Sequence, residues 1–332
     1  MCKNKMNTFF KFLLNVSILL FLSIIVIWVV VSRPINFTTG SYNPEHIVSP
    51  IRLTEHTKIL SEKLSPRDSD NPNNLIKTAK YIEKILNNSS KNVSLEYFDV
   101  NEKSYANVIA TYGPDSEEVI VIGAHYDAYS IFPGADDNAS GVAGLLELGK
   151  LIKTLNLKNR IELVAYTLEE PPNFATTNMG SAQHATNSRL KNKKIKIMIS
   201  LEMIGYFNEE EGSQQYPSKL LSLIYPDKGN FIAVVDQVLS NQAQSIKSAI
   251  NRHTDLSAYS INAPAFIPGI DFSDHRNYWI NDYPAVMVTD TSFYRNFNYH
   301  TLNDTYDRLD YEKMAKVIYG LFKYIQEIDS DT

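Results

Sequence analysis

The chain has 332 residues, of which 44% are hydrophobic and 21% charged, and its formal net charge is −5. This composition is typical of a folded protein rather than of a disordered, collagen-like or repetitive one. Lysine and arginine are scattered along the chain, so we expect no nucleic-acid partner. Cys2 is the only cysteine, so a metal site in the rest of the chain must use His, Asp and Glu as ligands.

The first long feature is an uncharged apolar run over residues 12–32, bounded by Lys11 and Arg33. About 20 apolar residues are enough to cross a bilayer as a helix. A cleaved signal peptide is the alternative, but its apolar region is usually shorter and ends at small residues. This run ends in the sequence WVVVSR, so we expect an uncleaved single-pass anchor that binds the lipid bilayer.

Charges around this run predict its orientation. Lys3, Lys5 and Lys11 precede it, while Arg33 is the only nearby cation after it. The positive-inside rule then leaves the N-terminus in the cytoplasm and the bulk of the chain outside the cell membrane. The expected organisation is a cytoplasmic tail (1–11), a transmembrane anchor (12–32), a linker (33–47) and a folded domain (48–332).

The folded domain shows alternating strand and helix patterns. The predicted strands are 93–100, 104–112, 117–127, 160–170, 194–206, 231–238 and 283–290. The predicted helices are 48–63, 73–87, 139–155, 178–190, a segment ending near 252, and 311–328. Such alternation predicts an α/β fold with a mixed, mostly parallel sheet that is covered by helices on both faces. No Gly-rich phosphate loop follows a predicted strand, so we expect no nucleotide cofactor.

Acidic residues and histidines gather where the predicted strands end. They are His125 and Asp127, Asp136 in the loop PGADDNASG, Glu169 and Glu170, Glu202, and His300. In open α/β sheets, sites form outside the carboxyl ends of the strands. We therefore expect five separate segments to deliver these side chains to one edge of the sheet.

This set of side chains is suited to two zinc ions. Asp136 is the natural bridging ligand, with His125 and Glu202 on one ion and Glu170 and His300 on the other. Each ion then has three protein ligands and room for a shared water, as a catalytic zinc site requires. Two zinc ions, three carboxylates and one hydroxide sum to zero charge. Glu169 is left as the general base, and Asp127 can orient His125 or the backbone beside it.

Each of these features has an ordinary alternative. His125 and Asp127 could be a plain strand-end pair, and Asp136 could belong to a helix cap. The pair Glu169 and Glu170 could be solvated, and His300 could be a loop histidine. Their joint occurrence, in this order and at these strand ends, favours the metal site.

Six motifs also carry a resemblance to a known family. HYD, PGADDNASG, LEEPP, SLEMIGY, SDHRNYW and NYHTLNDT resemble, in this order, the co-catalytic zinc aminopeptidase family that includes glutaminyl cyclases. The resemblance covers roughly residues 45–328. It implies a twisted mixed sheet of about eight strands, the same zinc ligands and base as above, and a cis peptide bond between Asp136 and Asp137.

Two positions depart from the family pattern. The position of Glu202 is often Asp in the aminopeptidases, and Glu has the longer reach. Some members place a Tyr three residues before the Ser of the SDH motif, where this chain has Ile270. Tyr294 and Tyr299 are the candidates to replace it. Asp274 and His275 of the same motif are interpreted as pocket or supporting residues, with a structural hydrogen-bonded pair as the alternative.

The resemblance therefore implies a hydrolase of peptide or amide bonds. The leading interpretation is an aminopeptidase that removes N-terminal residues from peptide substrates, with the bridging hydroxide as the nucleophile. A glutaminyl-peptide cyclotransferase is the first alternative, because it uses much the same ligand set with one working zinc. A non-catalytic binding protein on the same fold is the second.

Overall fold

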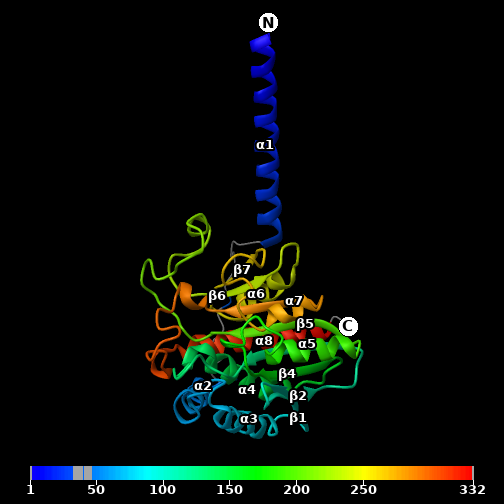
Figure 1. Ribbon diagram of the computed structural model, residues 1–332, viewed down its shortest axis with the longest axis vertical. Helices are drawn as coiled ribbons and strands as arrows, with labels where there is room; N and C mark the ends of the chain where they lie inside the picture. The colour runs from blue at the N-terminus through cyan, green and yellow to red at the C-terminus, as the bar shows by residue number, and fades with distance from the viewer. Residues whose placement is uncertain (1, 33–39, 41–46, 331–332) are drawn as a thin grey trace.

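The computed structural model describes residues 2–32, 40 and 47–330 (Figure 1). One eight-stranded mixed sheet runs through the domain in the order β1-β2-β4-β3-β5-β8-β6-β7. The strands are β1 (Asn92–Val100), β2 (Lys103–Tyr112), β3 (Glu118–His125), β4 (Arg160–Tyr166), β5 (Lys194–Glu202), β6 (Ile232–Asp236), β7 (Ala258–Asn262) and β8 (Ala285–Thr289). This sheet confirms the predicted fold class.

Helices cover both faces of the sheet. One face carries α2 (Pro50–Lys58), α3 (Pro72–Leu86), α4 (Gly141–Ile152), α6 (Gln242–His253) and α8 (Tyr311–Ser330), and the other carries α5 (Gly180–Leu190) and α7 (His275–Ile280). The short turns are η1 (Ile59–Lys63), η2 (Ala135–Ser140), η3 (Leu221–Leu223), η4 (Ser292–Tyr294) and η5 (Tyr306–Arg308). The long helix α1 (Cys2–Ser32) extends away from one end of the domain (Figure 1).

Two hydrophobic cores hold these layers together. Side chains alternate along β3, so that Ile120 and Ile122 pack into the larger core while Val119 and Val121 pack into the smaller one. A strand that is buried on both faces needs an apolar residue at nearly every position, which explains why β3 reads as a continuous apolar run.

The arrangement of the central strands determines where a site can form. β4, β3, β5 and β8 lie side by side and parallel, so their carboxyl ends share one edge of the sheet. The chain passes from β3 to β4 on one side and later places β5 on the other side of β3. This reversal leaves a crevice beyond the carboxyl end of β3, the position at which open α/β sheets bind their ligands.

Several elements differ from the prediction, including β5, which ends at Glu202 although its predicted range reaches 206. β4 ends at Tyr166, although its predicted range reaches 170, because the backbone leaves the sheet before the glutamate pair. β7 and α7 were not predicted. Both are short, and the five residues of β7 (AYSIN) show no clear alternation of apolar and polar residues that would stand out in the sequence.

Within the described residues, α1 is the one helix that is long and apolar enough to cross a membrane. Its apolar span is Phe9–Val30, with 22 residues and a mean hydropathy of 2.8. The predicted linker at 33–47 falls mostly outside the described residues.

Candidate active site

The parallel strands bring most of the predicted site residues to one edge. His125 is the last residue of β3 and Glu202 is the last residue of β5. Glu169 and Glu170 follow β4 after a short turn, and His300 lies in the loop between β8 and α8. The turn η2 before α4 adds an aspartate from a further segment. The convergence expected from the sequence is therefore present in the fold.

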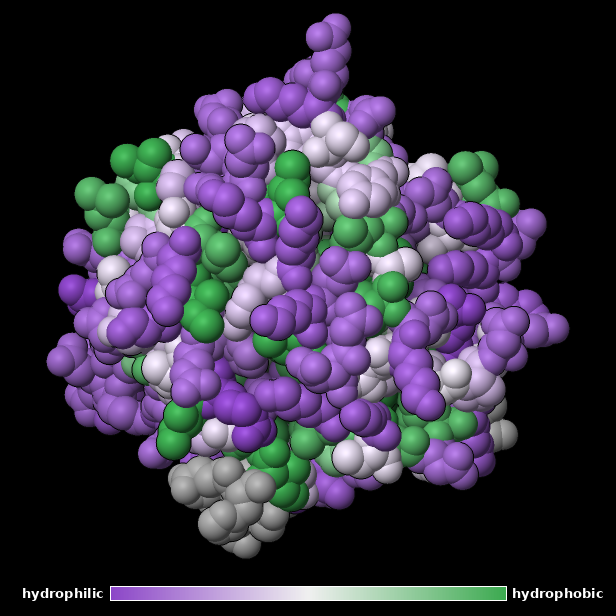
Figure 2. Space-filling view, turned by 90° about the horizontal axis from the view of Figure 1, so that it is seen from below, coloured by the Kyte–Doolittle hydropathy of each residue, from purple (hydrophilic) through white to green (hydrophobic). Residues whose placement is uncertain are grey.

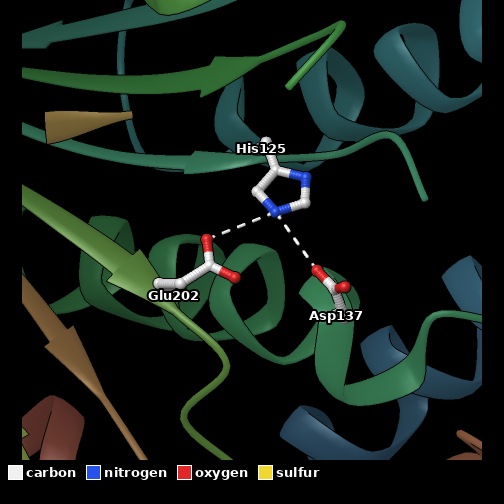
Figure 3. A group of neighbouring side chains, drawn as sticks. All are labelled: His125, Asp137 and Glu202. Atoms are coloured by element: carbon white, nitrogen blue, oxygen red, sulfur yellow. Dashed lines mark ion pairs between the residues drawn. The ribbon is translucent and has the colours of Figure 1, made fainter. Parts of the chain in front are cut away.

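The first group of ligand atoms joins β3, β5 and η2. His125 Nε2 lies 3.3 Å from Asp137 Oδ1 and 3.3 Å from Glu202 Oε2. Figure 3 shows the imidazole between the two carboxylates, each of which comes from a different element. All three side chains are buried.

The second group shares the same aspartate. His300 Nε2 lies 3.0 Å from Asp137 Oδ2 and 3.2 Å from Glu170 Oε2. Asp137 therefore directs one carboxylate oxygen to each group, which is the position of a ligand that bridges two ions. Ligand atoms in each group lie within 4.8 Å of one another, close enough to hold a metal ion.

Asp137 lies between the two groups, whereas the sequence analysis expected Asp136 in this position. Asp136 is fully buried, but its oxygens accept hydrogen bonds from Gly205 N (3.0 Å) and Asn296 Nδ2 (2.8 Å). Its carboxylate is thus used to join η2 to neighbouring loops, away from both ligand groups. The cis peptide bond is likewise one residue later than expected, between Asp137 and Asn138.

Residues that the sequence analysis did not single out hold this turn in place. Asp304 accepts hydrogen bonds from the backbone N–H groups of Asp136 and Asp137. The Asn138 amide donates to Leu201 O and accepts from Met203 N. Asp304 belongs to the motif NYHTLNDT, which also contains His300, so this motif indicates that Asp304 lies next to the site.

Asp127 supports both the histidine and the glutamate pair. Its two oxygens accept hydrogen bonds from Glu169 N (3.1 Å) and Glu170 N (3.0 Å). Oδ1 also lies 3.4 Å from His125 Nδ1, on the side of the ring that faces away from Asp137 and Glu202. Such a carboxylate fixes both the orientation of the imidazole and the path of the backbone.

The glutamate pair reaches the site from two directions. After β4 ends, Leu168 takes a left-handed backbone conformation with φ +58°, which breaks the alternation of an extended strand. Glu169 Oε2 then lies 3.9 Å from His125 Nε2, whereas Glu170 Oε2 faces His300. The backbone therefore bends before the pair, so that the two side chains reach different ligand groups.

Burial and mutual charge shift the ionisation of this cluster. Burial, opposed by His125, raises the pKa of Glu169 well above its ordinary value. Burial and the charge of Asp137 raise the pKa of Glu170 to about 8. Burial lowers the pKa of His300, but the close carboxylates of Asp137 and Glu170 outweigh it and leave that pKa at about 10. Carboxylates that are buried close together raise one another's pKa, and they also raise the pKa of the imidazoles between them.

Metal ions fit this set of donors. Three buried atoms of the cluster form no hydrogen bond of good geometry within the described part of the chain: His125 Nε2, His300 Nε2 and Glu170 Oε1. The two nitrogens nevertheless lie 3.0–3.3 Å from carboxylate oxygens, as expected of atoms that share a cation. Buried polar atoms without partners are costly, and a bound cation would satisfy them. Two imidazoles and three carboxylates are the nitrogen and oxygen ligands that zinc accepts.

The other predicted residues lie around the cluster. Burial raises the pKa of Asp274 to about 7, against the opposing charge of His125, so this carboxyl is coupled to the site. His275 Nε2 donates to Ile270 O at 2.8 Å and its ring packs edge-on against Trp279, which indicates a structural role. Tyr299 stacks on His300 with ring centroids 3.7 Å apart. Tyr294 donates its hydroxyl to Pro268 O.

A cavity of about 1280 Å³ opens onto these residues. Glu169, Glu170, Glu202, Asp137 and His300 lie on its wall, so a bound molecule would meet both ligand groups. The rest of the wall is largely apolar and includes the aromatic residues Phe174, Phe272 and Phe293.

The fold and the site together define a peptidase of the hydrolase class. Residues 107–325 match peptidase family M28, and the chain belongs to this family. An uncharacterized protein of Escherichia coli, YfbL, is 47% identical over 287 residues, which cover 84% of this chain and 88% of YfbL.

Solved structures share the fold at lower identity. The LapA aminopeptidase of Legionella pneumophila superposes with a TM-score of 0.69 at 18% identity, covering 89% of this chain and 78% of that one. A glutaminyl cyclase of Porphyromonas gingivalis superposes with a TM-score of 0.62 at 17% identity, covering 85% of this chain and 99% of that one. These neighbours confirm the expected resemblance to zinc aminopeptidases and glutaminyl cyclases.

Proposed function

We propose that the chain is an aminopeptidase that works with two zinc ions. His125 and Glu202 would hold one ion, Glu170 and His300 the other, and Asp137 would be shared between them. The observation that carries this proposal is the shared position of Asp137, with one oxygen 3.3 Å from His125 and the other 3.0 Å from His300. Two complete ligand groups around one carboxylate favour two ions over one.

The metal ions would supply Lewis acidity at the scissile carbonyl and at the attacking water. The three carboxylates of Asp137, Glu170 and Glu202 would offset most of the charge of two divalent cations. Burial of most of these side chains strengthens each electrostatic contact.

Glu169 would move the proton. Its carboxyl lies beside the first ligand group, and its backbone is held by Asp127. Glu169 would accept a proton from water as the water oxygen bonds to the carbonyl carbon, and donate it to the amine nitrogen as the C–N bond breaks. Burial raises the pKa of this carboxyl, which makes its ionised form a stronger base than an exposed glutamate.

Metal content and product analysis test this proposal together. The full chain, purified and loaded with zinc, should bind about two zinc ions and release chromophore from amino-acyl substrates. A chain with one zinc that instead cyclises N-terminal glutamine would be a glutaminyl cyclase. Zinc binding without turnover of either substrate would leave a non-catalytic binding protein.

His300 provides a further prediction. His300→Ala should lower bound zinc from about two to about one per chain and abolish most turnover, because it removes the imidazole of the second group alone. Metal analysis of the purified variant checks the stoichiometry. Unchanged zinc content would remove His300 from the ligand set.

The proposal also places the enzyme at the cell membrane. The apolar span Phe9–Val30 would cross the bilayer with the N-terminus in the cytoplasm and the catalytic domain, residues 48–332, outside. Lys3, Lys5 and Lys11 on the N-terminal side favour this orientation.

A truncated chain tests the anchor. A chain that begins at Asn43 should stay in the supernatant after ultracentrifugation without detergent and keep full turnover, because every proposed site residue lies beyond position 120. The full chain should require detergent. Aggregation or inactivity of the shortened chain would show that α1 does more than anchor the domain.

A further inference from the structure

The active-site cavity and the helix α1 share a wall. Phe21, Ile24, Ile25, Ile27 and Trp28 of α1 line the same cavity as the proposed catalytic and metal-binding residues. The helix therefore does not leave the domain at an arbitrary point. It leaves beside the mouth of the active site.

One hydrogen bond fixes the level at which the domain meets the helix. Trp28 Nε1 donates to Asn262 O, at the end of β7, over 3.0 Å. Trp28 lies two residues before the end of the apolar span at Val30, or about 3 Å along the axis at ~1.5 Å per residue. Tryptophan at such a position sits at the membrane–water interface. With α1 across a bilayer, the end of β7 therefore lies at the level of the bilayer surface.

Exposed apolar side chains surround this point. They form an apolar rim of Leu220, Leu223, Ile224, Val238, Leu239 and Phe266, all of which line the cavity that α1 also lines. Leu223 is 80% exposed and Phe266 is 86% exposed, although both are large and apolar. Large apolar side chains gathered in one exposed patch indicate a surface that contacts a membrane or another molecule.

The rim lies on the side of the domain from which α1 departs. In Figure 1, β6, β7 and the yellow-green loop between β5 and β6 are nearest to α1, whereas α2, α3 and β1 are at the opposite end. Figure 2 shows that opposite face, which is covered mainly by hydrophilic residues. The domain therefore has one apolar end, next to the apolar helix, and one polar end.

We propose that the apolar rim inserts into the surface of the bilayer that α1 crosses, so that the mouth of the active site opens at the lipid surface. This rests on the membrane anchor in the proposed function. The rim lines the same cavity as Ile24 and Trp28, which lie in the last turns of the span, the depth of headgroups and upper acyl chains. Substrates are then peptides whose N-termini lie at the membrane surface, such as those of membrane-bound chains.

Lipid-borne quenchers test this placement in the full chain. Cys2, the only cysteine, is replaced by Ser, and one new cysteine carries an environment-sensitive fluorophore. The rim variants are Leu223→Cys and Phe266→Cys. The matched control is Ile51→Cys, which is 72% exposed and lies on α2 at the opposite end of the domain. The positive control is Ile25→Cys on α1.

Each variant is inserted into phosphatidylcholine–phosphatidylglycerol vesicles that contain a doxyl quencher high on the acyl chain. Interfacial side chains reach ~5–10 Å into the boundary between headgroups and acyl chains, so this quencher matches their depth. We expect a blue shift and loss of fluorescence at positions 223, 266 and 25, and no change at 51.

Every other outcome overturns the proposal. Equal, unquenched emission at 223, 266 and 51 would show that the rim faces water. A blue shift at 223 and 266 without quenching would show that protein, such as a second copy of the chain, covers the rim. Lack of quenching at 25 would overturn the anchor and the rim proposal with it. Because the readout is fluorescence, none of these results affects the proposed peptidase activity, which turnover tests separately.

Discussion

Asp137→Asn should empty both metal sites and lower turnover by at least about 10³-fold. Asp137 is the one residue common to both ligand groups, with its two oxygens facing His125 and His300. An amide keeps the size of the side chain but removes the charge and one acceptor oxygen. A bound metal ion supplies several kcal/mol of transition-state stabilisation, and about 1.36 kcal/mol corresponds to tenfold in rate. Zinc analysis and turnover of an amino-acyl substrate measure the two effects.

The neighbouring residue is a matched control. Asp136→Asn makes the same chemical change one position earlier, where the carboxylate bonds to Gly205 N and Asn296 Nδ2. This carboxylate belongs to neither group of ligand atoms, so its loss of charge removes no metal ligand. We expect Asp136→Asn to keep both zinc ions. The assignment of the bridging ligand is wrong if Asp136→Asn loses zinc and Asp137→Asn keeps it.

The sequence predicts the location of the site because that location follows from topology. Parallel strands place their carboxyl ends together, so a histidine at the end of one strand and a glutamate at the end of the next must be near neighbours. His125 and Glu202 follow this rule directly, as the last residues of β3 and β5. The fold class follows in the same way from the alternation of strand and helix patterns.

The sequence does not predict in which direction the side chains inside the turns point. Asp136 and Asp137 are identical and adjacent, and the choice between them depends on Asp304 and Asn138, which hold the turn through contacts with distant segments. The end of β4 depends on the left-handed conformation of Leu168, a residue type that gives no local signal for it. These details are set by tertiary contacts, which periodicity and spacing do not encode.

Asn262 and Trp28 illustrate the same limit on a larger scale. The apolar run at 12–32 predicts a membrane span, but its contact with the edge strand β7 joins residues 234 positions apart. β7 itself is too short to be found by its pattern. The relation between anchor and active site is therefore visible only in the folded structure.

Glu169→Gln and Glu170→Gln should separate chemistry from metal binding at adjacent positions. Glu169→Gln should keep both zinc ions and normal stability while turnover falls on the order of 10²–10⁴-fold, the usual contribution of a general base. Glu170 Oε2 faces His300 in the second ligand group. Glu170→Gln should therefore lose about one zinc ion and melt at a lower temperature, since a ligand that binds only the native state stabilises it.

These two variants discriminate between a base and a metal ligand because the two residues differ mainly in the direction of their side chains. Both are buried glutamates, and the backbone N–H of each donates a hydrogen bond to the Asp127 carboxylate. A general defect in folding would therefore affect the two variants alike. Zinc content, melting temperature and turnover are measured on the same preparations. Near-normal turnover of Glu169→Gln, or equal zinc loss in the two variants, would contradict the assigned roles. The assigned roles are supported if only Glu170→Gln loses zinc and Glu169→Gln turns over slowly with both zinc ions bound. Glu169 would then be a base that contacts the water and not the metal.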